Sequence, residues 1–476
     1  MASGIARKVN MLCLLAAIIA VLLLPLKKEI WYDETVSMKC SKGISHDTPE
    51  SLAHLTTISS ASLAKLNTAN NVFTATVVDN SNSFLYNIGL HWFTKLFGNS
   101  ISTYTLFSML CSIAMLIAFF VLCGLFFGNS IFVSVAVLLL TMDNIFGMSH
   151  EIRAYAMGVF FIVTAGIYFY KFTFTESKPF YLLLTGLFSV AAVLSHFLSV
   201  YIVLVFLGVM LYVKRMALFS VKNILAILLP IALIGTFFFC AARGLQIMSK
   251  QNETIKLAAK GFSMGEVFIR AMKYTAINFK VVFPAFVGKL PVVILSFILL
   301  ISLYVFGLRS AINNEQKRNL NLLFVLGISG SLFLSLLCFK SHHYTAIYYR
   351  YFSFGVPFCC LFTAYALFVI AGDSKTNNLI KGGLVAGFVL PTAVLFVLGQ
   401  VNAAPLIKYN HIAIARQIVQ DNVTKIEVPE WSDALLIQCV LPEGYKIDYV
   451  RSPLTTNFTL YKATGTEVVP VIKNDT

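Results

Sequence analysis

Two adjacent carboxylates, Asp33 and Glu34, stand in the stretch KKEIWYDETVS, directly after the first long apolar run of the chain. A charge beside a membrane-length segment is costly unless water or a partner stabilises it. Such a pair can act as a general base, support a metal ion or stay solvated at the membrane interface. The residues alone leave these interpretations open.

Other ionisable side chains also border apolar runs. They are Asp79, Asp143, His150, Glu151, Arg153, His196, Lys340, His342, His343 and Arg350. Each has a structural interpretation as well: Glu151 and Arg153 can form a structural pair, and His196 can be a core histidine. Arg350, within YYRYF, suits an interfacial anchor as well as a phosphate ligand. If these groups converge at one depth, they predict an outward cavity for a charged substrate or an ion.

The elements that carry these groups are predicted to be membrane helices. The chain has 476 residues, of which 58% are hydrophobic and 12% are charged, about half the charged fraction of a soluble protein. We predict an all-α polytopic membrane protein with about eleven spans, in a range of roughly 10 to 13. The spans are expected near 10–26, 102–122, 130–142, 153–171, 179–195, 197–213, 221–243, 290–308, 319–339, 350–371 and 379–400. The segment 84–98 is short and polar, which favours a partial or interfacial helix.

Lys and Arg residues in the short loops indicate a cytoplasmic N-terminus. The loops that then face outward are 27–101, 143–152, 244–289, 340–349 and the tail after 400, and they carry the candidate residues. The net charge of +15 is explained by this topology and by anionic lipid, so we expect no nucleic-acid partner.

Two domains are predicted: a transmembrane domain over 1–400 and a small external α+β domain over 401–476. In the tail, residues 411–422 have helical apolar spacing. Four stretches are strand-like between turn residues, namely 424–431, 434–441, 445–450 and 457–462. The loop 244–289 is compatible with a mobile gate, with Gly261 and Gly265 as flexible points, and equally with a helical lid.

Four stretches also occur in a characteristic order. They are WYDETVS, DNSNSFLYNIGLHWFTKLFGNSISTYTLFS, MSHEIRAYAMGVFF and YYRYFSFGVPF. In this order the sequence resembles the GT-C superfamily of polyprenol-dependent glycosyltransferases, in the bacterial branch of lipid A aminoarabinose transferases and protein O-mannosyltransferases. It departs from the family where Ser81-Asn82-Ser83 stands for His-Pro-Pro, and where Thr105 or Leu106 stands for an arginine.

The resemblance implies a GT-C-like bundle that moves a sugar from a polyprenyl phosphate to a lipid, glycan or protein acceptor, with inversion. It implies a bacterial inner-membrane enzyme whose active site and C-terminus are periplasmic. Asp33 would be the general base, while Glu34 would orient the loop or support a metal. The implied donor-phosphate ligands are Arg153 and Arg350, with Lys340, His342 and His343 as secondary candidates.

The resemblance assigns the remaining candidates by loop. Asp79 belongs to the acceptor loop, and Asp143, His150 and Glu151 belong to the second external loop. Asp33 and Asp143 are the candidate ligands of a divalent metal, Mg²⁺ or Mn²⁺. Side-chain cations can serve instead of a metal, so both alternatives stay open.

Two other functions fit a charged outward cavity. A polysaccharide polymerase or ligase would use external Arg and His around a late loop, here 244–289. A non-enzymatic transporter of lipid-linked glycans would carry charges deep in its spans or broken helices at mid-membrane. The apolar centres of the predicted spans are nearly free of acids and bases, which favours a site on one side of the membrane.

Overall fold

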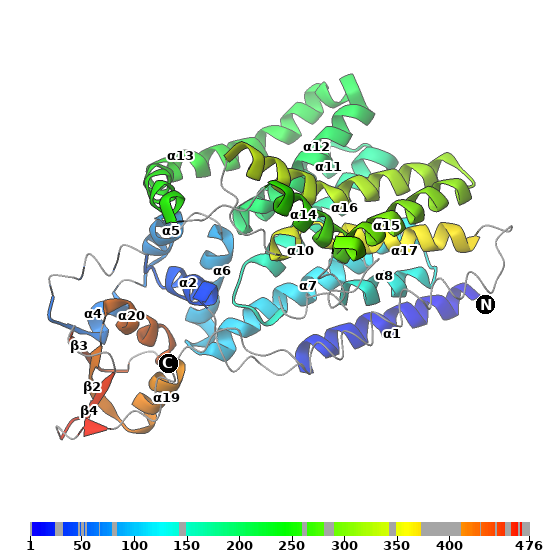
Figure 1. Cartoon of the computed structure of the whole chain (residues 1–476). Helices are drawn as coiled ribbons and strands as arrows, with labels where there is room; N and C mark the ends of the chain where they lie inside the picture. The colour runs from blue at the N-terminus through cyan, green and yellow to red at the C-terminus, as the bar shows by residue number, and fades with distance from the viewer. Residues whose placement is uncertain are drawn as a thin grey trace.

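The computed structural model describes residues 2–23, 32–45, 48, 52, 55–65, 67–78, 83–141, 149–258, 264–279, 290–341, 349–372, 411–428, 430–442, 445–452, 458–464 and 467–468. An elongated helical bundle carries a smaller mixed part at one end, on the left in Figure 1, and the N-terminus lies at the other end. The bundle comprises α1 (Ala2–Leu23), α7 (Ile101–Phe127), α8 (Phe132–Thr141), α10 (Tyr155–Tyr170), α11 (Pro179–Ser195), α12 (Val200–Lys214), α13 (Val221–Ala258), α14 (Met264–Asn278), α15 (Leu290–Ser310), α16 (Asn314–Ser341) and α17 (Val356–Gly372).

The prediction of a helical membrane protein is confirmed. Within the described residues, 7 helical segments are long and apolar enough to cross a membrane, and α8, α11 and α17 are shorter apolar helices. Together they overlap every predicted span that lies within the described residues, whereas 379–400 lies outside them, and the number of spans stays a prediction. Large apolar side chains such as Tyr212, Leu225 and Phe239 are exposed on the outside of the bundle, as expected where lipid replaces water.

Local sequence explains where several of these helices begin, end and meet. The Ser100 hydroxyl accepts the Thr103 N–H at the start of α7, and the helix ends at Gly128, whose φ of 58° favours glycine. Proline 179 opens α11, at a position where its missing N–H costs nothing. A Cβ on Gly186 of α11 would lie 2.5 Å from the Pro230 ring of α13, so the glycine lets these helices approach.

The small mixed part combines the first loop with the tail. Its helices are α2 (Tyr32–Ser41), α4 (Ser60–Ala64), α5 (Ala69–Val78), α6 (Phe84–Phe97), α19 (His411–Gln420) and α20 (Trp431–Val440). Its strands are β1 (Thr57–Ser59), β2 (Val423–Val428), β3 (Asp448–Arg451), β4 (Thr459–Lys462) and β5 (Glu467–Val468), in the order β1-β3-β2-β4-β5. Strand β1 pairs antiparallel with β3, with Ile58 opposite Tyr449.

One apolar core therefore joins two segments that lie far apart in the chain. It contains Ile58 and Leu90 from the first loop together with Trp431, Ile437 and Tyr449 from the tail. The Ser60 N–H donates to the Ile447 carbonyl at 2.8 Å. The predicted domain limit at residue 401 lies outside the described residues.

The prediction of a strand over 434–441 is wrong, because these residues form most of helix α20. Trp431, Ala434, Leu435, Ile437 and Cys439 are all buried. Helix α20 packs against α2 on one side and against α19 and β2 on the other. A segment that is apolar on nearly all sides cannot be told from a buried strand by periodicity alone.

The loop 244–289 is largely helical and partly inside the bundle. Helix α13 continues to Ala258, and α14 packs against α15, α16 and α17. The Thr363 hydroxyl of α17 donates to the Phe279 carbonyl at 2.7 Å, and a Cβ on Gly327 of α16 would lie 2.3 Å from the Phe279 ring. Gly265 lies in α14, whereas Gly261 lies outside the described residues. The chain after α13 therefore returns into the bundle before α15 begins.

Candidate functional site

A hydrogen bond joins the first loop to the start of α10. Glu34 in α2 is 1% exposed, and its Oε1 accepts the Ile152 N–H at 2.9 Å. Burying a carboxylate is costly unless hydrogen bonds replace its hydration. The YDET and HEIRAY stretches, which are far apart in the sequence, are therefore in direct contact.

A tight turn presents this N–H. The Arg153 N–H donates to the Glu151 carbonyl at 2.7 Å, a bond between residues two apart that closes a γ-turn. The Ile152 side chain is buried in the core of the mixed part, while Glu151 and Arg153 on either side of it are half-buried. His150 is buried, and its Nδ1 lies 2.8 Å from the Ser149 hydroxyl. The cation Arg153 and the carboxylates Glu34 and Glu151 thus all lie at or next to the Glu34–Ile152 hydrogen bond.

A row of rings extends from this turn into the bundle. The Arg153 guanidinium lies over the Tyr155 ring, 5.9 Å from its centroid. The Tyr155 ring lies 4.6 Å from the His196 ring, which lies 5.1 Å from Phe354. His196 also accepts the Leu198 N–H through Nδ1, so it has both a packing role and a helix-capping role here.

Phe354 belongs to the YYRYFSFG stretch, and two devices hold that stretch in place. The Tyr201 hydroxyl accepts the Gly355 N–H at 3.0 Å and donates to the Phe352 carbonyl at 3.2 Å. A Cβ on Gly158 of α10 would lie 2.7 Å from the Phe354 ring, so glycine is needed for this approach. The fourth motif stretch therefore meets the third at the start of α10.

Tyr86 lies close to the same contact. It is fully buried, and its hydroxyl lies 2.7 Å from the Ser108 hydroxyl. Burial raises its pKa well above the usual value; the Ser108 hydrogen bond and the Arg153 charge oppose this rise, while the Glu34 charge adds to it. The phenol therefore stays protonated and can only donate or accept a hydrogen bond.

Several predicted site residues cannot be located in this arrangement. Asp33, Lys340 and Arg350 lie in the helical backbone of α2, α16 and the turn Tyr349–Phe352, but their side chains lie outside the described part. Asp79, Asp143, His342 and His343 lie outside it entirely. Their predicted roles stay predictions. Glu34, Glu151, Arg153, His150 and His196 are the predicted residues that the structure brings to one end of the bundle.

Sequence reasoning missed one buried histidine. His91 in α6 is 0% exposed, and its Nδ1 lies 2.9 Å from the Ser41 carbonyl at the end of α2. Burial lowers its pKa; the Ser41 hydrogen bond opposes this, and the charges of Lys95 and Lys42 add to it. Asn87, His91 and Thr94 are buried on one face of α6, and this polar spacing of four and three residues is the signal that could have identified them.

The predicted metal ligands lie in the first and second external loops. Among the described residues, no group of three or more His, Cys, Asp or Glu side chains could hold a metal ion. Asp143 and the Asp33 side chain lie outside these residues. Glu34, the described carboxylate of the pair, is engaged by a backbone N–H, and this suits an orienting residue better than a metal ligand.

Comparisons with protein-family models, with curated proteins and with solved structures gave no match. The arrangement of Glu34, the Glu151–Arg153 turn and the Tyr155 ring row therefore has to be interpreted from its own chemistry.

Proposed function

We propose that the protein is a membrane glycosyltransferase of the GT-C type, which transfers a sugar from a polyprenyl phosphate to an acceptor outside the cytoplasm. The observation that carries this proposal is the 2.9 Å hydrogen bond from the Ile152 N–H to Glu34. It joins the two motif stretches that such an enzyme needs at one site. The packing of Phe354 against Tyr155 and His196 adds the YYRYFSFGVPF stretch to the same contact.

The transfer requires two kinds of group, a base for the acceptor hydroxyl and a cation for the leaving phosphate. The acceptor hydroxyl must lose a proton as it attacks the anomeric carbon, so a carboxylate must be within hydrogen-bond reach. In this proposal Asp33 is that base, and Glu34 holds helix α2 against the start of α10 while Asp33 acts. Glu34 is thus a positioning residue.

The leaving polyprenyl phosphate gains negative charge, and a cation must face it. Arg153 is half-buried beside the Tyr155 ring, and its planar guanidinium suits bidentate binding of phosphate oxygens. Arg350 is the second arginine of the proposal. Attack from the face opposite the phosphate inverts the anomeric centre.

The decisive experiment replaces Asp33 by Asn and measures transfer from a polyprenyl-phosphate sugar to native acceptors. Loss of a general base lowers the rate by about 10²- to 10⁴-fold, so we expect D33N to lose nearly all transfer. The matched control is Asp448→Asn, because Asp448 is exposed in β3. Normal turnover in correctly inserted D33N protein would remove Asp33 as the base.

A further inference from the structure

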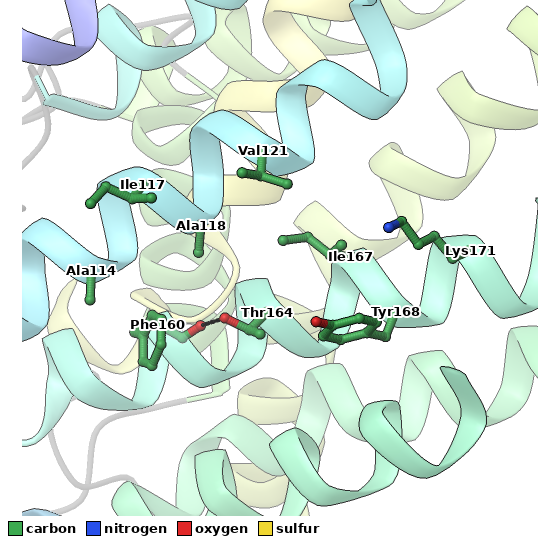
Figure 2. A pocket seen from close by; sticks show the side chains of 9 residues that line it. All are labelled: Ala114, Ile117, Ala118, Val121, Phe160, Thr164, Ile167, Tyr168 and Lys171. Atoms are coloured by element: carbon green, nitrogen blue, oxygen red, sulfur yellow. Dashed lines mark hydrogen bonds between the residues drawn. The ribbon is translucent and has the colours of Figure 1, made fainter. Parts of the chain in front are cut away.

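A groove of about 400 Å³ runs between α7 and α10. Figure 2 shows Ala114, Ile117 and Val121 along α7, facing Phe160 and Tyr168 of α10, with Lys171 beyond one end. The groove lies away from the Glu34 contact, because it begins beyond the first turn of α10 and continues to the last. Its walls are apolar over most of their length, and it has one cationic end.

The groove opens toward the surroundings of the bundle. Ile117 is 46% exposed and Val121 is 48% exposed, on a helix that is long and apolar enough to cross a membrane. The small side chain of Ala114 leaves room between the larger ones. Gly124, three residues after Val121, continues this side of α7, and a Cβ there would meet no atom within 4 Å. On a helix of this length and composition, exposed apolar positions face lipid chains.

The length of the groove matches one leaflet. Phe160 and Lys171 are eleven residues apart on a continuous helix, which is about 16 Å at 1.5 Å per residue. The hydrocarbon core of a bilayer is about 30 Å thick. An acyl chain lying in the groove would therefore extend over about half of that thickness and end beside Lys171.

The cationic end has a specific local structure. At Lys171 helix α10 changes to a π-helical turn, Lys171–Thr175, which closes with the Glu176 N–H donating to the Lys171 carbonyl at 2.9 Å; such turns are rare and frequent at functional sites. The Lys171 ammonium lies 6.0 Å from the Tyr168 ring centroid and 5.5 Å from that of Tyr181. Aromatic rings of this kind are typical of the membrane–water interface.

Charge at this end favours an anion. Glu176, the nearest carboxylate in sequence, is paired with Lys178 at 2.5 Å. The Lys171 charge contributes less than Lys178 to the lowered pKa of Glu176, and among the described residues Lys171 has no carboxylate within salt-bridge distance. We propose that the groove binds one acyl chain of an anionic phospholipid, with the lipid phosphate at Lys171. This assigns a lipid site in the leaflet opposite the candidate active site, and it does not depend on the proposed transferase activity.

Native mass spectrometry of the full chain, released from nanodiscs of phosphatidylglycerol or of phosphatidylcholine, tests the proposal. We expect wild-type protein to retain phosphatidylglycerol after delipidation and to retain phosphatidylcholine poorly. A direct contact between an exposed lysine and an anion contributes up to about 1 kcal/mol, so K171Q, which loses the contact with the lipid phosphate, should retain up to about five-fold less phosphatidylglycerol. Ile117→Trp, which fills the open side of the groove, should have at least the same effect.

Two control variants separate this site from general effects. Lys222→Gln removes an exposed lysine at the start of α13, and Leu225→Trp adds bulk to an exposed position on α13 outside the groove. Both should retain phosphatidylglycerol like the wild type. The assignment would be overturned if K171Q and K222Q retained phosphatidylglycerol equally, or if the wild type retained both lipids equally. It would also be overturned if the wild type were a dimer that I117W disrupts, because a second copy of the chain would then occupy the groove.

Discussion

Glu34 illustrates at the scale of one residue how a buried carboxylate can stabilise a contact between distant motifs. Replacing it by Ala leaves the Ile152 N–H without its acceptor in a buried position. An unsatisfied buried donor costs about 1 to 3 kcal/mol, so we expect E34A to lower the thermal unfolding midpoint of the purified protein. Glu34→Gln retains an acceptor oxygen and should cost less.

The matched control for this prediction is Glu176→Ala. Glu176 forms an exposed ion pair with Lys178, and such pairs contribute about 0 to 1 kcal/mol. Its loss should barely change the midpoint. Equal midpoints for E34A and E176A would mean that the Glu34 contact contributes nothing to stability.

The sequence indicated some of the site at this scale and could not indicate the rest. Residue types identified Glu34, Glu151 and Arg153 as candidates, because charges beside apolar runs are unusual. One partner of Glu34 is a backbone N–H, and every residue except proline has one, so no pattern of side chains could have predicted this contact. His91 was overlooked because a histidine on an apolar helix is usually a core residue.

Strands β1 and β3 pair with each other and so join the first loop to the tail. Thr57 lies opposite Val450 in the antiparallel register, where paired Cα atoms are about 4.5 to 5.5 Å apart. This separation lies within the range of a disulfide. We therefore expect a Thr57→Cys, Val450→Cys double variant to form a disulfide under mild oxidation, detected by intact mass after alkylation.

Thr57→Cys with Lys462→Cys serves as the control. In the strand order β1-β3-β2-β4, Lys462 lies in a strand that is three places from β1, about 14 Å away at 4.8 Å per strand. No bond should form there. A disulfide in the control pair, or the absence of a disulfide between positions 57 and 450, would contradict the sheet register.

Elements were predictable to the extent that they depended on local periodicity. Seven membrane-length apolar segments among the described residues and the helix within 411–422 were predicted correctly, because lipid or one apolar face specifies them. Residues 434–441 were predicted wrongly, because α20 is covered by α2 as well as by its own sheet. The return of α14 into the bundle depends on Gly327 admitting the Phe279 ring, a contact between segments that sequence spacing does not reveal.

The whole molecule has two chemically different ends. At the end away from the mixed part, Lys214 donates to the Ser177 hydroxyl and Arg318 lies over the Phe174 ring. The loops there carry most of the basic residues on which the predicted orientation rests. We expect a cysteine at Lys65 in the first loop to react with an impermeant maleimide in intact cells. A cysteine at Asn314 should react only after permeabilisation.

Wild-type protein gives the background of this measurement, because Cys240 is exposed on a bundle helix. The opposite labelling pattern would mean that the orientation is the reverse of the predicted one, with the Glu34 contact on the cytoplasmic side. The proposed outward-facing transferase would then be excluded, whereas the α7–α10 lipid site would remain possible in the other leaflet.

The sheet that unites first loop and tail also sets an order in biosynthesis. Ser60 and Ile447, which hydrogen-bond beside the β1–β3 pair, are 387 residues apart. At about 5 to 20 residues per second, the ribosome needs roughly 20 to 80 s to make the intervening chain. During that interval β1 has no partner strand, while the helices enter the membrane. Completion of the sheet is thus a late event in assembly. It occurs only in chains whose tail has reached the same side of the membrane as the first loop.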